Sequence, residues 1–459
     1  MKARLPPLFR TVTVLLAAGA TAATAGFNFF NPSVRDSIPK LISGTGMYKD
    51  ILTKALTPDI TLYEINAPLW TDGAVKQRYI AVPKGTSVLY SETDDVYKYP
   101  EGAMVIKNFS VDTIPGDSAS RILFETRFSG MRKIGGKEKW FLWSYHWRLD
   151  QKDADLVPDS GQNATVRVYR NGKAAAPYMK KWRFPSPVQC AACHRIQTPD
   201  GRMVLAFFTA QLNHPYSGNP AINQLQHFFD IGLLANAAGA PAPNFATAPK
   251  WAHWDDTTAS LELRARSYIA ANCSGCHGER GMLTNATLTA TLNYDYHDMQ
   301  PQMDFVTKKL IGSFPLDSAG LIVPGRPDRS VLLYRQKMRN QVEGDFTAER
   351  MAMPPLGSFE PDTNAINMIS KWIVSLGTSS IKGGLLSHAR GDVGLRSGRI
   401  VLPAGWMNGE AGVLTLISLQ GRSIPLVQSD ERTYRIGAKT VQGMHLLLWN
   451  GKPVKRLMF

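Results

Sequence analysis

All four cysteines of this 459-residue chain belong to one short pattern, C-x-x-C-H, which occurs twice. The first copy is Cys190-Ala191-Ala192-Cys193-His194, and the second copy is Cys273-Ser274-Gly275-Cys276-His277. C-x-x-C-H is the attachment signature of c-type haem. Two thiols about one helical turn apart each add to a vinyl group of the haem, and the following histidine becomes an axial ligand of the iron. The sequence therefore predicts two covalently bound haem c groups.

Three other uses of paired cysteines fit the pattern less well. A disulfide framework needs no histidine after each pair. A zinc site built from two C-x-x-C pairs does not explain two histidines at the same offset. A thioredoxin-like redox pair lacks its βαβ context in this chain.

The axial ligands follow in part from the motifs. We expect His194 to bind the first iron and His277 the second. Met353 is our prediction for the sixth ligand of the second iron, because Met351-Ala352-Met353-Pro354 precedes an apolar helical stripe and resembles the sixth-ligand loop of class I cytochromes c. Met351 is the alternative ligand, and a purely structural thioether at Met353 is a third possibility.

The sixth ligand of the first iron is less determined by the sequence. We favour Met203, because a short loop would bring it back over the haem. A five-coordinate iron is the alternative, and it would leave an open site for chemistry. The other candidates are Met179, His146, His214 and His227.

The N-terminus predicts export. Lys2, Arg4 and Arg10 form a basic region, residues 12–18 are apolar, and Ala23-Thr24-Ala25 is typical of a cleavage site, so residues 1–25 are predicted to be a signal peptide. An uncleaved anchor is the alternative, although the apolar stretch is short for a span. No later apolar run is long enough to cross a membrane, so we expect no membrane span after signal removal.

Composition separates the rest of the chain into segments. Residues 40–180 are rich in β-branched and aromatic residues, broken by Gly, Pro and Asp, which predicts a β-rich N-terminal domain. We expect its strands at residues 77–82, 103–109, 122–128, 140–148 and 164–169. The first haem segment is residues 181–240, and the second haem domain is residues 255–380. Alternating residues in 383–459 predict a small C-terminal β-sandwich.

Two helical stripes, at residues 261–269 and 366–376, flank the second motif. They resemble the terminal helices of a class I cytochrome c domain. The expected fold class is therefore multidomain α+β, with a β-rich N-terminal domain, α-helical cytochrome c-like haem domains and the C-terminal β-sandwich.

The order of segments also resembles a known family. Residues 62–73, with the sequence LYEINAPLWTDG, precede Lys76-Gln77-Arg78-Tyr79-Ile80, the first haem motif and then Gln211-Leu212-Asn213. This arrangement is similar to a family of exported bacterial dihaem c-type cytochromes that has no assigned substrate. The resemblance covers about residues 40–378 and implies haem binding and electron transfer.

The C-terminal tail does not fit that family. Residues 416–422 and 443–449, with the ending Arg456-Leu457-Met458-Phe459, are similar to C-terminal sorting domains of the type IX secretion system. The resemblance implies transport to the cell surface; otherwise we expect a periplasmic protein. An accessory module that binds a carbohydrate or a partner protein is the alternative.

These features favour an electron carrier over a catalyst, and we assign no catalytic residue. Electrons would pass between an unknown protein donor and acceptor through the two haems. A dihaem peroxidase or oxygenase with an open first haem is the alternative, as is a surface-attached redox or binding protein. The net charge of +15 suits an acidic partner, the secretion machinery or a surface polymer, but it also suits a solvated basic face. The chain has no nucleic-acid-binding motif, so nucleic acid is not an expected partner.

Overall fold

A computed structural model describes most of the chain before residue 278 and shorter stretches after it. The described residues are 26–91, 97–170, 176–194, 204–236, 239–277, 320–338, 352–354 and 357–382, together with short strands between residues 394 and 458. The predicted signal peptide, residues 1–25, lies outside the described residues.

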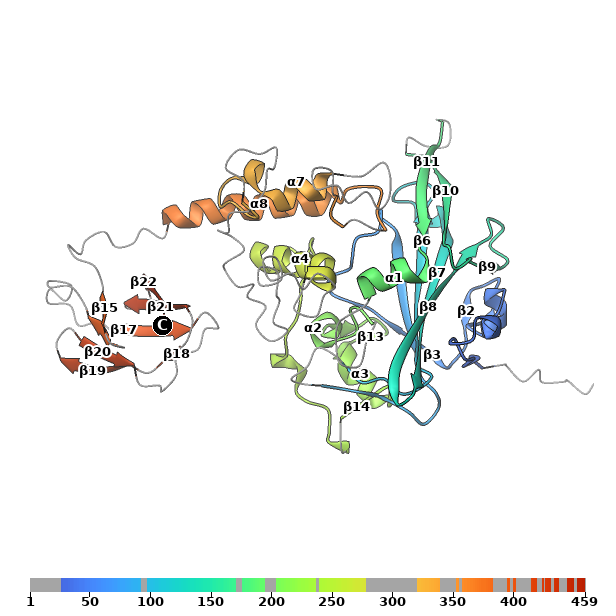
Figure 1. Ribbon diagram of the computed structural model, residues 1–459, viewed down its shortest axis with the longest axis horizontal. Helices are drawn as coiled ribbons and strands as arrows, with labels where there is room; N and C mark the ends of the chain where they lie inside the picture. The colour runs from blue at the N-terminus through green and yellow to red at the C-terminus, as the bar shows by residue number, and fades with distance from the viewer. Residues whose placement is uncertain are drawn as a thin grey trace, which may run out of the picture.

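An antiparallel six-stranded sheet is the largest element of the structure (Figure 1). Its strand order is β3-β4-β6-β7-β8-β9. The strands are β3 (Ile60–Tyr63), β4 (Val75–Ala81), β6 (Met104–Asp112), β7 (Arg121–Ile134), β8 (Lys137–Trp147) and β9 (Ala154–Leu156). Strands predicted at residues 77–82, 103–109, 122–128 and 140–148 correspond to β4, β6, β7 and β8.

Side chains alternate between the two faces of this sheet, so it contributes to two separate cores. On one face, Tyr79, Ile106 and Phe128 pack with the segment that contains Phe27 and Ile42. On the other face, Ile80 and Met131 pack with Phe207, Leu225 and Phe228, which follow the first motif in the chain. The sheet is therefore buried on both sides, and the second face is the one that meets the C-x-x-C-H segments.

A two-stranded hairpin and short elements complete the N-terminal half. The hairpin pairs β10 (Gln162–Val168) with β11 (Tyr178–Phe184), and β10 corresponds to the strand predicted at 164–169. The shorter strands are β1 (Tyr48–Asp50), β2 (Ala55–Leu56), β5 (Val88–Leu89), β12 (Pro215–Tyr216), β13 (Asn219–Asn223) and β14 (Leu234–Ala235).

The helices lie on one side of the large sheet (Figure 1). They are α1 (Pro187–His194), α2 (Thr209–Leu212), α3 (Gln224–Asp230), α4 (Leu261–His277), α7 (Val331–Lys337) and α8 (Thr363–Lys382). Helix α1 contacts β8 and α4, and α8 contacts both α4 and α7. Their shared core includes Ile269 of α4, Leu333 of α7 and Trp372 of α8, all of which are buried. None of the described helices is long and apolar enough to cross a membrane.

The C-terminal strands form two four-stranded antiparallel sheets, with orders β15-β16-β20-β19 and β18-β17-β21-β22. The strands are β15 (Gly394–Arg396), β16 (Arg399–Val401), β17 (Leu414–Ser418), β18 (Ser423–Ile424), β19 (Leu426–Asp430), β20 (Thr433–Ile436), β21 (Met444–Trp449) and β22 (Lys452–Met458). In Figure 1 they lie beyond the end of α8.

The predicted fold class is wrong in its α-helical part. The described residues are mainly β, and the large sheet dominates them, so α-helical cytochrome c-like domains are not what this chain forms. The physical reason is that α1 packs against β8 of the large sheet and also contacts α4, whose core is shared with α7 and α8. The first motif helix therefore belongs to the sheet's packing and not to a helical domain of its own. Local helical stripes predicted individual helices correctly, but they carried no information about this packing.

Candidate functional site

Helix α1 presents the first motif, and a capping box sets where it begins. The hydroxyl of Ser186 accepts a hydrogen bond from the Gln189 amide (3.2 Å), and the Gln189 side chain accepts one from the Ser186 amide (3.0 Å). This reciprocal pair satisfies two amides that a helix start otherwise leaves unpaired. Pro187 occupies the first helical position, where its missing N–H costs nothing. The sequence Ser-Pro-Val-Gln therefore starts the helix one turn before Cys190.

Helix α4 presents the second motif at its C-terminal end. Its N-terminal half is anchored by Ala265 and Ile269, which are fully buried against α7 and α8. Tyr268 also donates a hydrogen bond to Asp362, the residue before α8 (3.1 Å). Packing along one stripe thus holds the helix. Cys273 packs against the same core, and the last turn of the helix carries Cys276.

The structure brings the two motifs together. Cys193 donates a hydrogen bond to Cys276, which raises the pKa of Cys193 and lowers the pKa of Cys276. A Cβ placed on Gly275 would lie 3.4 Å from the carbonyl oxygen of Cys193, so the helix backbones themselves are close. Nothing in the spacing of 83 residues between the motifs predicts this contact.

All four thiols are free and none is exposed. Burial raises the pKa of Cys190 to about 11 and that of Cys273 to about 12. Within each helix the two cysteines are three residues apart, so both thiols lie on one side, with the histidine at the helix end. This donor set fits a covalently bound haem at each motif.

The zinc alternative finds no support in the described part of the chain. There, no group of three or more His, Cys, Asp or Glu side chains is placed to hold a metal ion. Covalent haem does not need such a group, because each motif contributes a single iron ligand.

Met353, our predicted sixth ligand of the second iron, lies beside α7. Its amide donates to the carbonyl oxygen of Arg335 in α7 (3.1 Å), and its side chain is half-buried. Because α7 and α4 share one core, Met353 and Cys273 belong to the same part of the molecule. Met203, Met351 and the side chain of His277 lie outside the described residues.

The other candidates for the first iron have local surroundings of their own. His146 hydrogen-bonds to Gln162 (2.8 Å), and His214 hydrogen-bonds to Gln224 (3.1 Å). The ring of His227 stacks on that of Tyr216 with centroids 3.9 Å apart, and Met179 is exposed. None of these four is shown to face Cys190.

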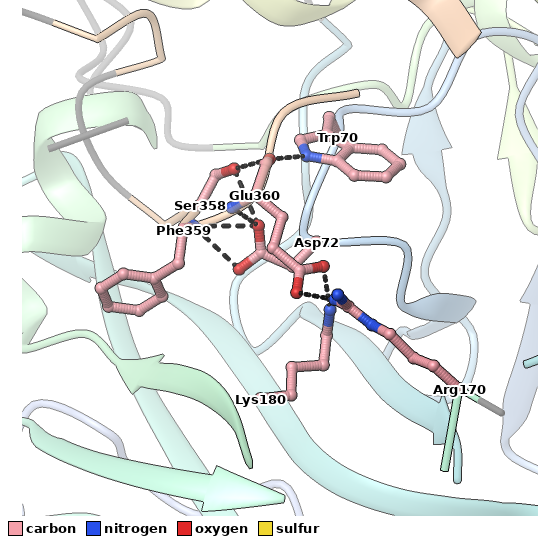
Figure 2. Close-up of polar contacts among 7 residues, drawn as sticks. All are labelled: Trp70, Asp72, Arg170, Lys180, Ser358, Phe359 and Glu360. Carbon is pink, nitrogen blue, oxygen red and sulfur yellow. Dashed lines mark hydrogen bonds and ion pairs between the residues drawn. The ribbon is translucent and has the colours of Figure 1, made fainter. Parts of the chain in front are cut away.

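A buried carboxylate joins the large sheet to the segment that follows Met353 (Figure 2). Asp72 accepts hydrogen bonds from the amides of Phe359 and Glu360 (2.9 and 2.8 Å) and from the hydroxyl of Ser358 (2.9 Å). Burial raises the pKa of Asp72, against these hydrogen bonds, which lower it. Asp72 has a φ of 46°, in the left-handed region, so the turn before β4 aims its side chain at residues 358–360. We call this contact the Asp72 clasp.

Further contacts reinforce the clasp (Figure 2). The indole of Trp70 donates to the carbonyl oxygen of Glu360 (2.7 Å), and the Glu360 carboxylate pairs with Arg170 (2.7 Å) and with Lys180. The Trp70 amide also donates to the Asn272 side chain (2.7 Å), directly before Cys273. Residues 70–72 therefore contact both the second motif helix and the segment after Met353.

Sequence reasoning missed this role of residues 70–72. The stretch Leu69-Trp70-Thr71-Asp72-Gly73 contributed only to a family resemblance. An Asp-Gly turn signals a change of direction, but it does not say what the carboxylate will contact 286 residues later in the chain.

Comparisons with known proteins do not identify the chain. No family model, no curated protein and no solved structure matches it. Neither the dihaem cytochrome resemblance nor the sorting-domain resemblance is supported by these comparisons, and both stay predictions.

Proposed function

We propose that this chain is an exported dihaem c-type cytochrome that passes electrons between a protein donor and a protein acceptor. The observation that carries the proposal is the contact between Cys193 of α1 and Cys276 of α4. Groups attached to two adjoining helix ends lie close together, as electron transfer between them requires. The function is thus argued from the site and not from the fold.

Each residue has a distinct task in this proposal. The thiols of Cys190 and Cys193 hold one haem, and those of Cys273 and Cys276 hold the other. His194 and His277, the last residues of α1 and α4, each supply a proximal imidazole. When bound, the haems supply reversible one-electron chemistry, and the protein tunes it through ligands, burial and charge.

Met353 and Met203 stay our candidates for the remaining ligands. The Met353 segment is held at both ends, by the Arg335 carbonyl at residue 353 and by the Asp72 clasp at residues 358–360. A thioether on a fixed segment favours a constant ligand set in both oxidation states and a raised potential.

The proposal is tested by counting covalent haems. The protein is produced in a host that attaches haem c, and intact mass and the pyridine haemochrome spectrum are measured. We expect two haems in the unaltered chain and one in each double variant, Cys190→Ala/Cys193→Ala or Cys273→Ala/Cys276→Ala. A chain that matures without haem while a control cytochrome is loaded would overturn the proposal.

One observation favours a second candidate function, a peroxidase or oxygenase with an open first haem. His146, His214 and His227 each have local partners, so the first iron has no described histidine assigned to its distal side. A high-spin signal from one haem in the ferric electron paramagnetic resonance spectrum, together with peroxide or dioxygen turnover, would favour a peroxidase or oxygenase. Two low-spin signals, one of them lost in Met353→Ala, would favour pure electron transfer.

A further inference from the structure

Three cations stand side by side on the face of the large sheet that meets the motif helices. Arg78 of β4 is opposite Lys107 of β6, and Lys107 is opposite Arg127 of β7. Lys76 lies two residues before Arg78 on the same face. We call these four residues the cation row. Like charges directly opposite each other on neighbouring strands destabilise a sheet, so such a row needs an explanation.

The described residues supply little negative charge to the row. Glu125 is fully buried and lies on the same face, but it already accepts from Arg127 (2.8 and 2.9 Å) and from the Trp182 indole (2.9 Å). Asp72 and Asp362 act electrostatically on Lys76, and each is engaged in other hydrogen bonds. Glu125 also acts electrostatically on Lys107, so this one carboxylate is shared between Arg127 and Lys107, and positive charge remains in excess along the row.

Among these cations, Arg78 most clearly lacks a partner for its guanidinium group. Only 8% of the residue is exposed, and its Nη2 is buried without a hydrogen-bond partner among the described residues. Lys107 Nζ lies over the Phe109 ring, 4.9 Å from its centroid. Lys76 Nζ donates to the carbonyl oxygen of Leu69 (2.6 Å), which carries no full charge.

These buried cationic side chains could together bind an anion, and leaving them unpaired destabilises the folded protein. Burying a guanidinium without a partner costs far more than burying a paired one. Burial, with Arg78, Lys76 and Arg127, also holds the pKa of Lys107 well below its usual range. A carboxylate within reach would satisfy Arg78 Nη2 and relieve the repulsion along the row.

The cation row begins near the first motif and extends across the sheet from there. Ala191 of α1 packs in the same cluster as Val105 and Leu142, and Val105 shares its face with Lys107. Arg127, on the strand next to β8, is close enough to Cys190 and Cys193 to interact electrostatically with both. From Arg127 the row continues through Lys107 to Arg78, roughly 10 Å over two strand spacings. Haem attaches to cysteines by its vinyl edge and carries its two propionate carboxylates on the opposite edge.

We propose that the cation row is a carboxylate-binding site that receives the propionates of the haem attached at Cys190 and Cys193. The inference rests on the proposed function and deepens it, because it says how the sheet orients that haem and sets its potential. Arg78 and Lys107 are positioning residues here, since they bind the edge of the haem and not the iron. The same chemistry would bind a small free carboxylate or phosphate, and the test separates the two sources.

The test compares Arg78→Met and Lys107→Met with Lys139→Met, an exposed lysine on β8 away from the row. All three are measured as the haem-loaded full chain. Positive charge beside a haem favours its reduced state, so losing it lowers the potential. For the two row variants we expect at least a tenfold shift of the first haem's reduction equilibrium toward the oxidised form. That is 59 mV for a one-electron couple. We expect no change in the potential of the second haem, and no change of either potential in the control. Arg78→Lys keeps the positive charge, so its first-haem potential should stay close to that of the unaltered chain.

The possible outcomes separate this inference from the proposed function. If the unaltered chain carries no covalent haem, the proposed function fails first. If both haems are attached and the first potential is the same in Arg78→Met, Lys107→Met and the control, the propionate assignment is wrong while the function stands. If inorganic phosphate or acetate shifts the first potential saturably, and Arg78→Met abolishes that shift, the row binds a free anion instead. A preserved second-haem spectrum shows that a variant has folded.

Discussion

At the scale of single residues, Asp72 combines a left-handed backbone conformation with a buried carboxylate. A non-glycine residue with a φ of 46° and a buried carboxylate is held in that state by its hydrogen bonds with residues 358–360. Backbone conformations of this kind persist only where the surroundings support them. The clasp therefore links the stability of this turn to the order of the segment after Met353.

Asp72→Ala is expected to destabilise the protein by about 1–3 kcal/mol, because the half-buried amides of Phe359 and Glu360 lose their acceptor. The measurement is urea unfolding of the haem-loaded chain, followed by tryptophan fluorescence and by the second haem's absorption. Asp72→Asn keeps one acceptor oxygen and should lose less. Equal stability of Asp72→Ala and the unaltered chain would show that the clasp does not hold this segment.

Lys76 leads to a prediction about pH in the haem-free protein. Burial, with Arg78 and Arg127, lowers the pKa of Lys76 from 10.5 to about 7, although Asp362 and Asp72 oppose the shift. Between pH 7 and 10.5 the unfolded chain then binds more protons at this site than the folded chain does. Stability is therefore expected to rise with pH across that window, by up to about 1.4 kcal/mol per pH unit.

This prediction is measured by unfolding a variant in which all four cysteines are replaced by alanine. Lys76→Met in the same background should remove the rise that Lys76 contributes, whereas Lys139→Met should leave it in place. A stability profile that falls between pH 7 and 10.5, or one that Lys76→Met leaves unchanged, would contradict it.

At the scale of elements, the sequence carried strong signals for strands and for helix starts. Stretches rich in β-branched and aromatic residues between turn signals placed β4, β6, β8 and β10 within three residues of their observed bounds, whereas β7 continues six residues past its predicted end. The capping box at Ser186-Pro187-Val188-Gln189 marks the start of α1 by a purely local mechanism. Local signals suffice because pleat alternation and helix capping depend on neighbours in the chain.

Ser186→Ala is expected to cost about 1 kcal/mol, because the Gln189 amide loses its cap. Hydrogen exchange should show faster exchange of the α1 amides, with little change in α4. Ser160→Ala, in an exposed loop, is the matched control. Unchanged protection of α1 in Ser186→Ala would mean that packing against β8 alone holds this helix.

At the scale of the whole molecule, the large sheet acts as the common support for both motifs. Its second face packs against α1, and α1 in turn meets α4. The connection between β3 and β4 holds residues 358–360 through Asp72. In Figure 1, α1 lies beside the sheet, α4 lies next to α1, and α8 runs above α4. The motif contact can be tested without haem.

In the haem-free chain, mild oxidation is expected to form a disulfide between Cys193 and Cys276 more readily than one between Cys190 and Cys193. The reason is that Cys193 and Cys276 are within hydrogen-bond reach, while the thiols of one motif are fixed along a single helix. Non-reducing peptide mapping by mass spectrometry identifies the linked peptides. Cys193→Ala should abolish the link and Cys190→Ala should not, and disulfides only within each motif would show that the two helices do not meet.

The sequence by itself determined the local elements of this protein and predicts its chemistry. C-x-x-C-H predicts haem attachment because the thiol and imidazole positions follow from helical spacing, and the strands of the large sheet follow from β-branched and aromatic composition between turn residues. Only the tertiary structure decided that the motif helices meet, that Asp72 clasps residues 358–360, and that Arg78, Lys107 and Arg127 align. The expected cytochrome c-like domains were wrong for the same reason. Packing against a sheet built from residues 60–156 depends on contacts between distant parts of the chain, and no local pattern encodes those contacts.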